Sequence, residues 1–501
     1  MAKRKGDISR RELLARGIAF GGTAMLGSST ELLGQEAHPE GAVPPTVVDP
    51  LDDLRASLRG ELLTSADPAY DEARKLWNGM FDKRPAAIAR CAGTADVISA
   101  VKFARSNDLA VSVRGGGHNV AGKALRDGAL AIDLSPMKGL RVDPKVKTAR
   151  AQGGVTWGQF DRETVAFDLV TTGGTVSTVG IAGLTLGGGI GWLMRKYGLV
   201  SDNLVSVDIV TADGQFLTAS ESENADLFWA VRGGGGNFGV VTSFEYRLHK
   251  LEPITAGAAF YPFAMAKDAF HFYREFTSSA PDSVTTMAGV MNGPEGTPLA
   301  GEKAVWIGVC HSGPATEGER LLRPIKEFGP PAMDMIGPMP YTALQTLFDA
   351  DYPSGNRIYW RSDFLTELSD EVIDIVVARS DGLPSTAGST PFFEHMHGAV
   401  GRVGEQDTAF ANRAAKYNLS VLTVWKDSGE DDKNIKWTRE FSDAIRSFAT
   451  GAGYVNYMTE NEGAERIRAT YDANYERLVA IKRKYDPTNF FSGNQNITPQ
   501  T

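Results

Sequence analysis

The sequence predicts an α+β protein built from two regions, and three observations lead to this prediction. The chain has 501 residues, more than one hydrophobic core usually serves. Its 55 glycines are roughly 11% of the chain against a usual share of about 7%, and they gather between residues 115 and 239. From about residue 252 glycine becomes sparse, and strand-like and helical runs alternate. We therefore expect one region before about residue 252 and a second region after it.

Composition excludes several classes of protein. Hydrophobic residues make up 42% and charged residues 23% of the chain, which is typical of a globular protein and not of a disordered one. The formal net charge is −9, and this acidic balance argues against binding to nucleic-acid phosphates. The two cysteines, Cys91 and Cys310, form no metal motif and no disulfide framework, so we expect two buried thiols.

The N-terminus resembles an export signal. Residues 9–14 read SRRELL, a basic stretch precedes them, and a mildly apolar run follows at 17–26. That run is too short and too glycine-rich to span a bilayer. We expect a twin-arginine signal over 1–37, export of the folded protein to the periplasm or the exterior, and a linker with a helical lead-in over 38–79. The alternative is a basic tail without a targeting role.

The first region is expected to open with a strand, a helix and a second strand. An apolar run covers 86–91, Thr94 is placed to cap a helix, and Val111 and Val113 alternate with polar neighbours. The further elements expected are a strand at 129–134, a helix at 156–166 with Trp157 and Phe160 on one side, a helix at 224–231, strands at 242–248 and 304–310, a helix at 434–449, and a helix at 471–485 that Asp486 and Pro487 end.

Three glycine-rich blocks, at 114–119, 172–198 and 232–241, indicate a ligand held against the main chain. The third block matches the G-x-G-x-x-G fingerprint at 234–239, but a helix is expected before it and a strand after it. That is the wrong context for a Rossmann fold, so we do not predict a nicotinamide cofactor. Glycines still let main-chain N–H groups approach a pyrophosphate and form an anion-binding nest. The alternative is that they only permit tight turns; three blocks flanked by apolar elements favour a ligand.

His118 follows three of these glycines directly. A lone histidine is more often a hydrogen-bonded structural residue. This one lies where main chain and ligand would be closest, and a neutral imidazole can bond covalently to an electrophilic cofactor carbon.

At these residues the sequence resembles the berberine-bridge-enzyme-like flavoprotein oxidases of the vanillyl-alcohol-oxidase or p-cresol-methylhydroxylase (PCMH) superfamily. The resemblance covers nearly all of the chain after residue 80. The matching stretches are SVRGGGHNVAG at 112–122, the block at 172–198, RGGGGNFGVVTSFEYRL at 232–248, YVNY at 454–457 and NYERLVAIKRKYDPTNFF at 474–491.

The resemblance implies a two-subdomain, PCMH-type FAD-binding fold over 80–251, completed by 451–501. It also implies a separate α+β substrate domain of antiparallel sheet backed by helices over 252–450. FAD would lie extended with its pyrophosphate on the glycine loops, and His118 matches the histidine that bonds to the 8α carbon of the flavin. The residues that the resemblance places at FAD are Arg114, Gly115, Gly116, Gly117, His118, Asn119, Gly174, Thr175, Val176, Thr178, Val179, Gly180, Gly183, Gly188, Gly189, Asn237, Gly239, Val240, Val241 and Asn489.

Two positions in the second block refine this picture. Many relatives attach flavin a second time through a cysteine, and Val176 stands at that position here. The resemblance therefore implies a single attachment without a cysteinyl link, as in relatives of the 6-hydroxy-D-nicotine oxidase type. Val179 matches a position where a small β-branched residue accompanies oxygen access, and the alternative is that it only packs in its loop.

Tyr457, the second tyrosine of YVNY, matches a catalytic tyrosine of several relatives. A tyrosine has an ordinary pKa near 10, so to act as a base it needs nearby positive charge or donors that lower its pKa. The alternative is an aromatic wall of the pocket. Where plant alkaloid relatives carry a glutamate base, this chain has Ser420, and a serine alone is no base.

His395 and His397 lie two residues apart, so on a strand they would face the same side. They could share a metal ion, but no third ligand lies at a suitable spacing, and we predict no metal site. We expect both to bind substrate, because the matching region of relatives faces it. Phe392, Phe393 and Tyr457 are expected to give this pocket aromatic walls.

Together these features predict an FAD-dependent oxidase. It would oxidise an organic alcohol, amine or phenol by hydride transfer to covalently bound flavin, and O2 would reoxidise the flavin to give H2O2. The alternatives are a flavin dehydrogenase or oxidative cyclase with another electron acceptor, a non-catalytic flavin-binding protein, and a metal-dependent oxidoreductase that uses the two histidines.

Overall fold

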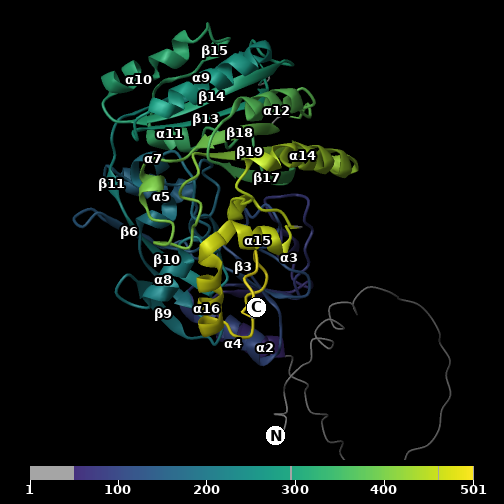
Figure 1. Ribbon diagram of the computed structural model, residues 1–501. Coiled ribbons are helices and arrows are strands. Elements are labelled where there is room, and N and C mark those ends of the chain that lie inside the picture. The colour runs from purple at the N-terminus through teal and green to yellow at the C-terminus, as the bar shows by residue number, and fades with distance from the viewer. Residues whose placement is uncertain (1–49, 294–295, 387, 461, 500–501) are drawn as a thin grey trace, which may run out of the picture.

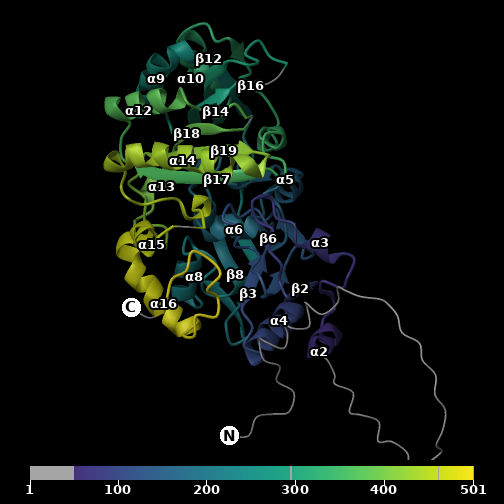
Figure 2. The ribbon, with the colours of Figure 1, turned by 90° about the vertical axis from the view of Figure 1, so that its right-hand side faces the viewer.

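The computed structural model describes residues 50–293, 296–386, 388–460 and 462–499. The predicted signal over 1–37 and the first part of the predicted linker lie outside the described residues. Two smaller sheets lie at one end of the molecule and a larger sheet at the other (Figures 1 and 2). No helix among the described residues is long and apolar enough to cross a membrane.

The first sheet has the strand order β1-β2-β4-β3, and both β2 and β3 run parallel to β4. The predicted strand, helix and strand are confirmed, but Thr94 is not the N-cap. Gly93 is the N-cap in an extended conformation, and the Asp96 carboxylate accepts hydrogen bonds from the N–H groups of Gly60 and Ala92. The elements are α2 (Pro50–Ser57), β1 (Glu61–Leu63), α3 (Tyr70–Ala73), β2 (Ala87–Arg90), α4 (Thr94–Ser106), β3 (Val111–Arg114) and β4 (Leu130–Asp133).

The second sheet is antiparallel, with the order β5-β6-β10-β8-β9. Thr156 and Gln159 form a capping box at the start of α5, and Trp157 and Phe160 are both buried, as predicted. A helix precedes the third glycine block and a strand follows it, as predicted. The elements are β5 (Leu140–Asp143), β6 (Thr148–Gln152), α5 (Trp157–Val165), α6 (Ile181–Leu186), α7 (Met194–Tyr197), η1 (Val200–Asn203), β8 (Leu204–Val210), β9 (Phe216–Ser220), α8 (Ala225–Val231) and β10 (Val240–Arg247), with β7 (Leu169–Val170) paired to β11 (His249–Lys250).

The third sheet is the largest and is antiparallel throughout. Its path runs β15-β12-β14-β13-β18-β19-β17, and β16 pairs with β12. Helices α9, α10, α12 and α14 lie along it (Figure 1). The elements are β12 (Ile254–Pro262), α9 (Ala266–Ser279), β13 (Val284–Asn292), β14 (Lys303–Ser312), α10 (Ala315–Glu327), β15 (Met333–Asp334), β16 (Gly337–Pro338), α11 (Tyr341–Gln345), β17 (Arg357–Leu365), α12 (Asp370–Ser380), β18 (Thr390–His395), α13 (Ala399–Arg402), β19 (Tyr417–Trp425) and α14 (Asp431–Ile445).

The C-terminal segment runs back from the large sheet to the smaller ones (Figure 1). The helix predicted at 471–485 begins only at Tyr475, because Asp472 adopts φ +43° and separates α15 (Ala464–Tyr471) from α16 (Tyr475–Tyr485). In α16, fully buried Lys482 pairs with Asp486 at 2.7 Å and donates to the carbonyl of Asn237. The third glycine block is thereby tied to the C-terminal segment.

One buried arginine connects the smaller sheets to the large one. Arg195, on α7, donates to the carbonyls of Val284 at 2.8 Å and Met396 at 2.7 Å. Val284 is the first residue of β13, and Met396 directly follows β18. This docking brings the second glycine block against the ends of β13 and β18, where the candidate site lies.

Candidate active site

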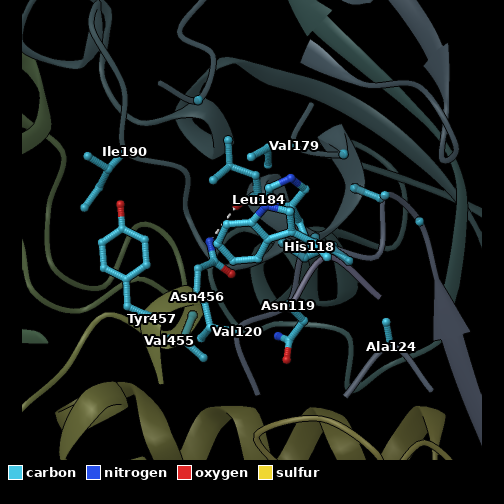
Figure 3. Close-up of a pocket in the computed structure, with 18 of the residues that line it drawn as sticks. His118, Asn119, Val120, Ala124, Val179, Leu184, Ile190, Val455, Asn456 and Tyr457 are labelled. Carbon is cyan, nitrogen blue, oxygen red and sulfur yellow. Dashed lines mark hydrogen bonds between the residues drawn. The ribbon is translucent and has the colours of Figure 1, made fainter. Parts of the chain in front are cut away.

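A single continuous cavity lies between the glycine blocks and the large sheet. Its first half is lined by the loops at 115–124, 174–186 and 235–241. Its second half is lined by residues of β13, β14, β17, β18 and β19 and by η5 (Val455–Tyr457). Figure 3 shows His118 and Tyr457 among the residues of the lining.

A close contact between two glycines fixes the shape of the first half of the cavity. A Cβ atom on Gly116 would lie 2.5 Å from the main-chain nitrogen of Gly180, and a Cβ on Gly180 would lie 2.5 Å from that of Gly116. The loops therefore touch main chain to main chain. Within the described residues, the N–H groups of Gly115, Gly116 and Gly117 donate no hydrogen bond. Such consecutive N–H groups suit an anion such as a pyrophosphate.

His118 is held at the junction of the two halves. Its Nε2 lies 2.9 Å from Thr178 Oγ1, and its ring stacks on Trp77 with centroids 4.3 Å apart. Burial lowers the pKa of His118 to about 3, so the imidazole is neutral at physiological pH. Trp77 in turn donates from Nε1 to the carbonyl of Tyr352 at 2.9 Å. Trp77 lies in the segment predicted as a lead-in and was not predicted as a site residue.

Most residues predicted at FAD line the cavity, and Thr178 contacts His118 beside it. Those that line it are Gly115, Gly116, Gly117, His118, Asn119, Gly174, Thr175, Val176, Val179, Gly180, Gly183, Asn237, Gly239 and Val241.

Five predicted residues lie elsewhere, and the prediction is corrected for them. Arg114 donates to the carbonyl of Ala73. Gly188, with φ +112°, packs against Phe410, and the N–H of Gly189 donates to the hydroxyl of Tyr454. Val240 packs in the core of the first sheet. Asn489, with φ +54°, lies in a turn after α16.

Lys123 is a lining residue that the sequence reasoning missed. It is the one lysine or arginine in the described lining. Its Nζ donates to the carbonyl of Asn494 at 3.0 Å, and Asn494 Nδ2 donates to the carbonyl of Gly236 at 2.6 Å. Lys123, which follows the first block, is thus hydrogen-bonded to the C-terminal segment, and that segment is hydrogen-bonded to the third block. The available signal was its position five residues after His118, directly after the matched stretch at 112–122.

The second half of the cavity has aromatic walls. Trp306, Phe348, Trp360 and Phe392 line it, together with Met287, Tyr352 and Leu422. Phe392 was predicted here, but Phe393 was not predicted correctly. Phe393 points to the opposite face of β18, where its ring packs on Phe270.

Tyr457 lies in the cavity, but its surroundings differ from those predicted. Its hydroxyl donates to Glu394 Oε1 at 3.1 Å, and its ring stacks on Trp360 with centroids 3.8 Å apart. Burial, followed by the negative field of Glu394, holds the pKa of Tyr457 well above its usual value. The lowered pKa that a tyrosine base would need is therefore absent from this structure. A catalytic role for Tyr457 remains a prediction.

Glu394 is a second ionisable lining residue that the sequence reasoning missed. It is buried, and it accepts a hydrogen bond from Asn418 Nδ2 at 2.6 Å as well as the one from Tyr457. Burial raises its pKa to about 7. Asn418 is its partner across β18 and β19, whereas Ser420 pairs with Phe392. The available signal was a lone acidic residue inside an apolar strand.

The two predicted substrate histidines lie outside the lining, and that prediction is corrected. His395 is buried on the opposite face of β18 from Glu394, with its Nε2 3.0 Å from Arg195. Burial and this arginine lower its pKa to about 2. His397 follows the strand, adopts φ +60° and is exposed. Across the described residues, no group of three or more His, Cys, Asp or Glu side chains could hold a metal ion.

These residues fit a flavin dinucleotide. The unpaired N–H groups of Gly115 to Gly117 and the ammonium of Lys123 offer donors and positive charge for a pyrophosphate. The neutral imidazole of His118 lies on the same lining.

Comparisons with known proteins agree with this fit. Residues 85–220 match the family model of an FAD binding domain, and residues 453–498 match the berberine and berberine-like family. An FAD-linked oxidoreductase of Dictyostelium discoideum is 32% identical over 447 residues, which cover 88% of this chain and 95% of that protein. The (R)-6-hydroxynicotine oxidase of Paenarthrobacter nicotinovorans is 31% identical over 455 residues, which cover 89% and 98%.

Solved structures give the same answer. The crystal structure of 6-hydroxy-D-nicotine oxidase from Arthrobacter nicotinovorans matches with a TM-score of 0.79 and 29% identity, covering 89% of this chain and 99% of that one. The BBE-like 1 protein of Physcomitrella patens matches with a TM-score of 0.80 and 25% identity, covering 88% and 97%. With its PCMH-type FAD-binding fold, the chain belongs to the berberine-bridge-enzyme-like family of FAD-linked oxidoreductases.

Proposed function

We propose that this oxidoreductase is an exported oxidase that carries FAD covalently on His118. Its substrate is an organic alcohol, amine or phenol, and O2 is its electron acceptor. The observation that carries the proposal is the cavity itself. It joins a glycine-lined half that holds His118 to an aromatic half that holds the Glu394–Tyr457 pair.

Bound flavin supplies the redox chemistry, accepting a hydride from the substrate. The chain supplies the rest. His118 is neutral and oriented by Thr178 and Trp77, which suits a nucleophile that forms one covalent link. Val176 is in the lining, and neither cysteine is. Both observations support a single attachment.

Replacement of His118 tests the attachment. In the wild-type protein precipitated with acid, we expect the flavin to stay in the pellet, on the peptide that contains residue 118. In the variant His118→Ala, the flavin should move to the supernatant, because the nucleophile is gone.

The variant His249→Ala is a matched control for this experiment. His249 also stacks on an aromatic ring, that of Tyr197, and is hydrogen-bonded through Nε2 to Asn203, but it lies outside the cavity lining. Its replacement should leave the flavin in the pellet. Wild-type flavin that is fully extractable, or flavin still bound covalently in His118→Ala, would contradict the attachment.

Glu394 and Tyr457 supply the proton acceptor. Ionised Glu394 can take the hydroxyl proton of Tyr457 through their 3.1 Å hydrogen bond while the tyrosine oxygen takes a proton from the substrate. Glu394 is thus the base, and Tyr457 relays the proton to it. Because burial raises the pKa of Glu394 to about 7, it titrates within the physiological range. The carboxylate form is needed, so substrate oxidation should fall as pH drops through about 7.

The variant Glu394→Gln tests this assignment. In this variant, the rate at which a known substrate reduces the flavin without oxygen should fall about 10²- to 10⁴-fold, the usual contribution of a general base. The change in this rate near pH 7 should also disappear. Ser420→Ala, at a buried neighbouring position on β19, should keep both the rate and the step. An unchanged profile in Glu394→Gln would remove Glu394 from the role of base.

A dehydrogenase or an oxidative cyclase with another acceptor is the alternative. Val179 lines the cavity with a small side chain, and by resemblance this favours reaction with oxygen. Stopped-flow mixing of the reduced protein with air-saturated buffer separates the cases. Fast reoxidation with release of H2O2 is expected; slow reoxidation would favour the dehydrogenase or cyclase. Flavin that no organic donor reduces would favour a non-catalytic binding protein.

Export is the remaining part of the proposal. The SRRELL stretch at 9–14 supports it, and the folded state that twin-arginine transport carries suits a protein loaded with cofactor before export. Cell fractionation of wild-type protein and of a variant with Arg10 and Arg11 replaced by Lys tests this part independently of the chemistry.

A further inference from the structure

A carboxyl group and an amide group lie buried together where α5 packs against α11, outside the cavity lining (Figure 1). Asp161, on α5, and Gln345, the last residue of α11, are each only 1% exposed. Gln345 Nε2 donates to Asp161 Oδ2 at 2.8 Å. The other oxygen of each side chain, Asp161 Oδ1 and Gln345 Oε1, is buried and has no hydrogen-bond partner among the described residues. An unpaired buried acceptor is costly, and this one contact contains two.

A single proton on Asp161 accounts for both unpaired oxygens. An ionised carboxylate has only acceptors, whereas a neutral carboxylic acid also has one O–H donor. With the proton on Oδ1, this donor bonds to Gln345 Oε1 while Gln345 Nε2 still donates to Oδ2. The acid and the amide are then joined by two hydrogen bonds, and no charge is buried. Asp161 and Gln345 are called the acid–amide pair below.

The surroundings of the pair favour the neutral acid. Burial raises the pKa of Asp161 to about 7, and the hydrogen bond from Gln345 lowers it only in part. Tyr341 faces the carboxyl group from α11, and burial holds the pKa of this phenol well above its usual value, so it is uncharged. The other ionisable side chains on α5 and on β5 and β10, which pack against it, make no described hydrogen bond or ion pair with Asp161, and β7 has none; they are Arg141, Asp143, Arg162, Glu163 and Tyr246.

The acid–amide pair joins the two helices that carry opposite walls of the cavity. At the start of α5, the N–H of Trp157 donates at 2.9 Å to the carbonyl of Val179, a lining residue. Directly after α11 the chain reaches Phe348, which lines the cavity from the other side, and Asp349, which accepts from Ser177. Any change in the pair therefore acts on the contact between the second glycine block and the segment that follows α11.

From these features we infer that Asp161 carries a proton in the closed protein, and that the acid–amide pair is a pH-sensitive clasp between the two walls of the cavity. When the proton passes to water at higher pH, the hydrogen bond from Oδ1 to Gln345 Oε1 is lost. A charged oxygen then faces the negative end of the amide dipole, and α5 separates from α11 more often. The clasp thus loosens as pH rises, a property that goes beyond the proposed oxidase.

Amide hydrogen exchange of the purified full-length protein tests the inference. Exchange is followed by mass spectrometry in peptides that cover 155–180 and 341–356, and each rate is divided by that of an unstructured peptide at the same pH. Opening gives the carboxyl group its ordinary pKa near 3.9, so the closed state loses its advantage as pH rises toward about 7. The corrected rate should rise about tenfold between pH 6 and pH 8 and level off above.

The variant Asp161→Asn replaces the acid by a group of the same shape that does not titrate. Its Nδ2 donates to Gln345 Oε1 at every pH, so the tenfold rise should disappear and the protection at pH 8 should exceed that of wild type. Asp168→Asn is the matched control, because Asp168 is exposed and its φ of +56° is one that asparagine tolerates. This control should show the wild-type rise.

The variant Gln345→Glu gives a second test that does not depend on the folding of Asp161→Asn. Two buried carboxyl groups in contact can share one proton, but they cannot easily both ionise, so the rise with pH should be steeper than in wild type. A wild-type rate that does not change with pH, a tenfold rise that persists in Asp161→Asn, or a Gln345→Glu protein no steeper than wild type would overturn the inference. Exchange is measured without substrate, so these outcomes are separate from those that test the oxidase.

Discussion

The close contact between Gly116 and Gly180 is the constraint on which the site depends. Either residue with a side chain would place a Cβ atom 2.5 Å from the nitrogen of the other, a separation that real Cβ atoms do not adopt. The contact fixes the first glycine block against the second. As a result, Thr178 meets His118, and Gly115, Gly116 and Gly117 line the cavity, with no main-chain hydrogen bond from their N–H groups among the described residues.

The second half of the site depends on how the large sheet docks. Arg195 places four of its five hydrogen bonds on carbonyls near the ends of β13 and β18, and the fifth contact is to His395. On the other side, Asp349 accepts from both the N–H and the hydroxyl of Ser177. These contacts bring the aromatic walls and Glu394 over the glycine loops. The cavity is thus lined by residues of two regions and belongs to neither alone.

Much of the first half could be predicted from the sequence because its signals are local. Glycine runs, His118 and Val179 lie in contiguous stretches, and a contiguous loop keeps its residues together in any fold. Arg114 and Asn489 were wrongly predicted to contact FAD, because a stretch that matches a family motif also contains residues that lie outside the cavity lining. Lys123 was missed because its partners, Asn494 and Gly236, are far away in the sequence.

The second half could be predicted only in part, and the reason is the period of a strand. Side chains alternate between the faces of β18, so Phe392 and Glu394 face the cavity, whereas Phe393 and His395 face away. A prediction that is wrong by one residue therefore selects the side chains of the wrong face. The sequence alone does not say which face of β18 is covered by α9. Tyr457 was found, but the field that acts on it comes from Glu394 across the cavity, which only the fold brings near.

The flavin content of a single variant tests the account most directly. Purified wild-type protein should show the flavin absorption band with one flavin per chain. Gly180→Ala should lose most of it in the fraction that remains folded by circular dichroism. Gly337→Ala, where a Cβ meets nothing within 4 Å, should keep it. A colourless wild-type protein, or a folded Gly180→Ala protein with full flavin content, would contradict the claim that this main-chain contact builds the cofactor site.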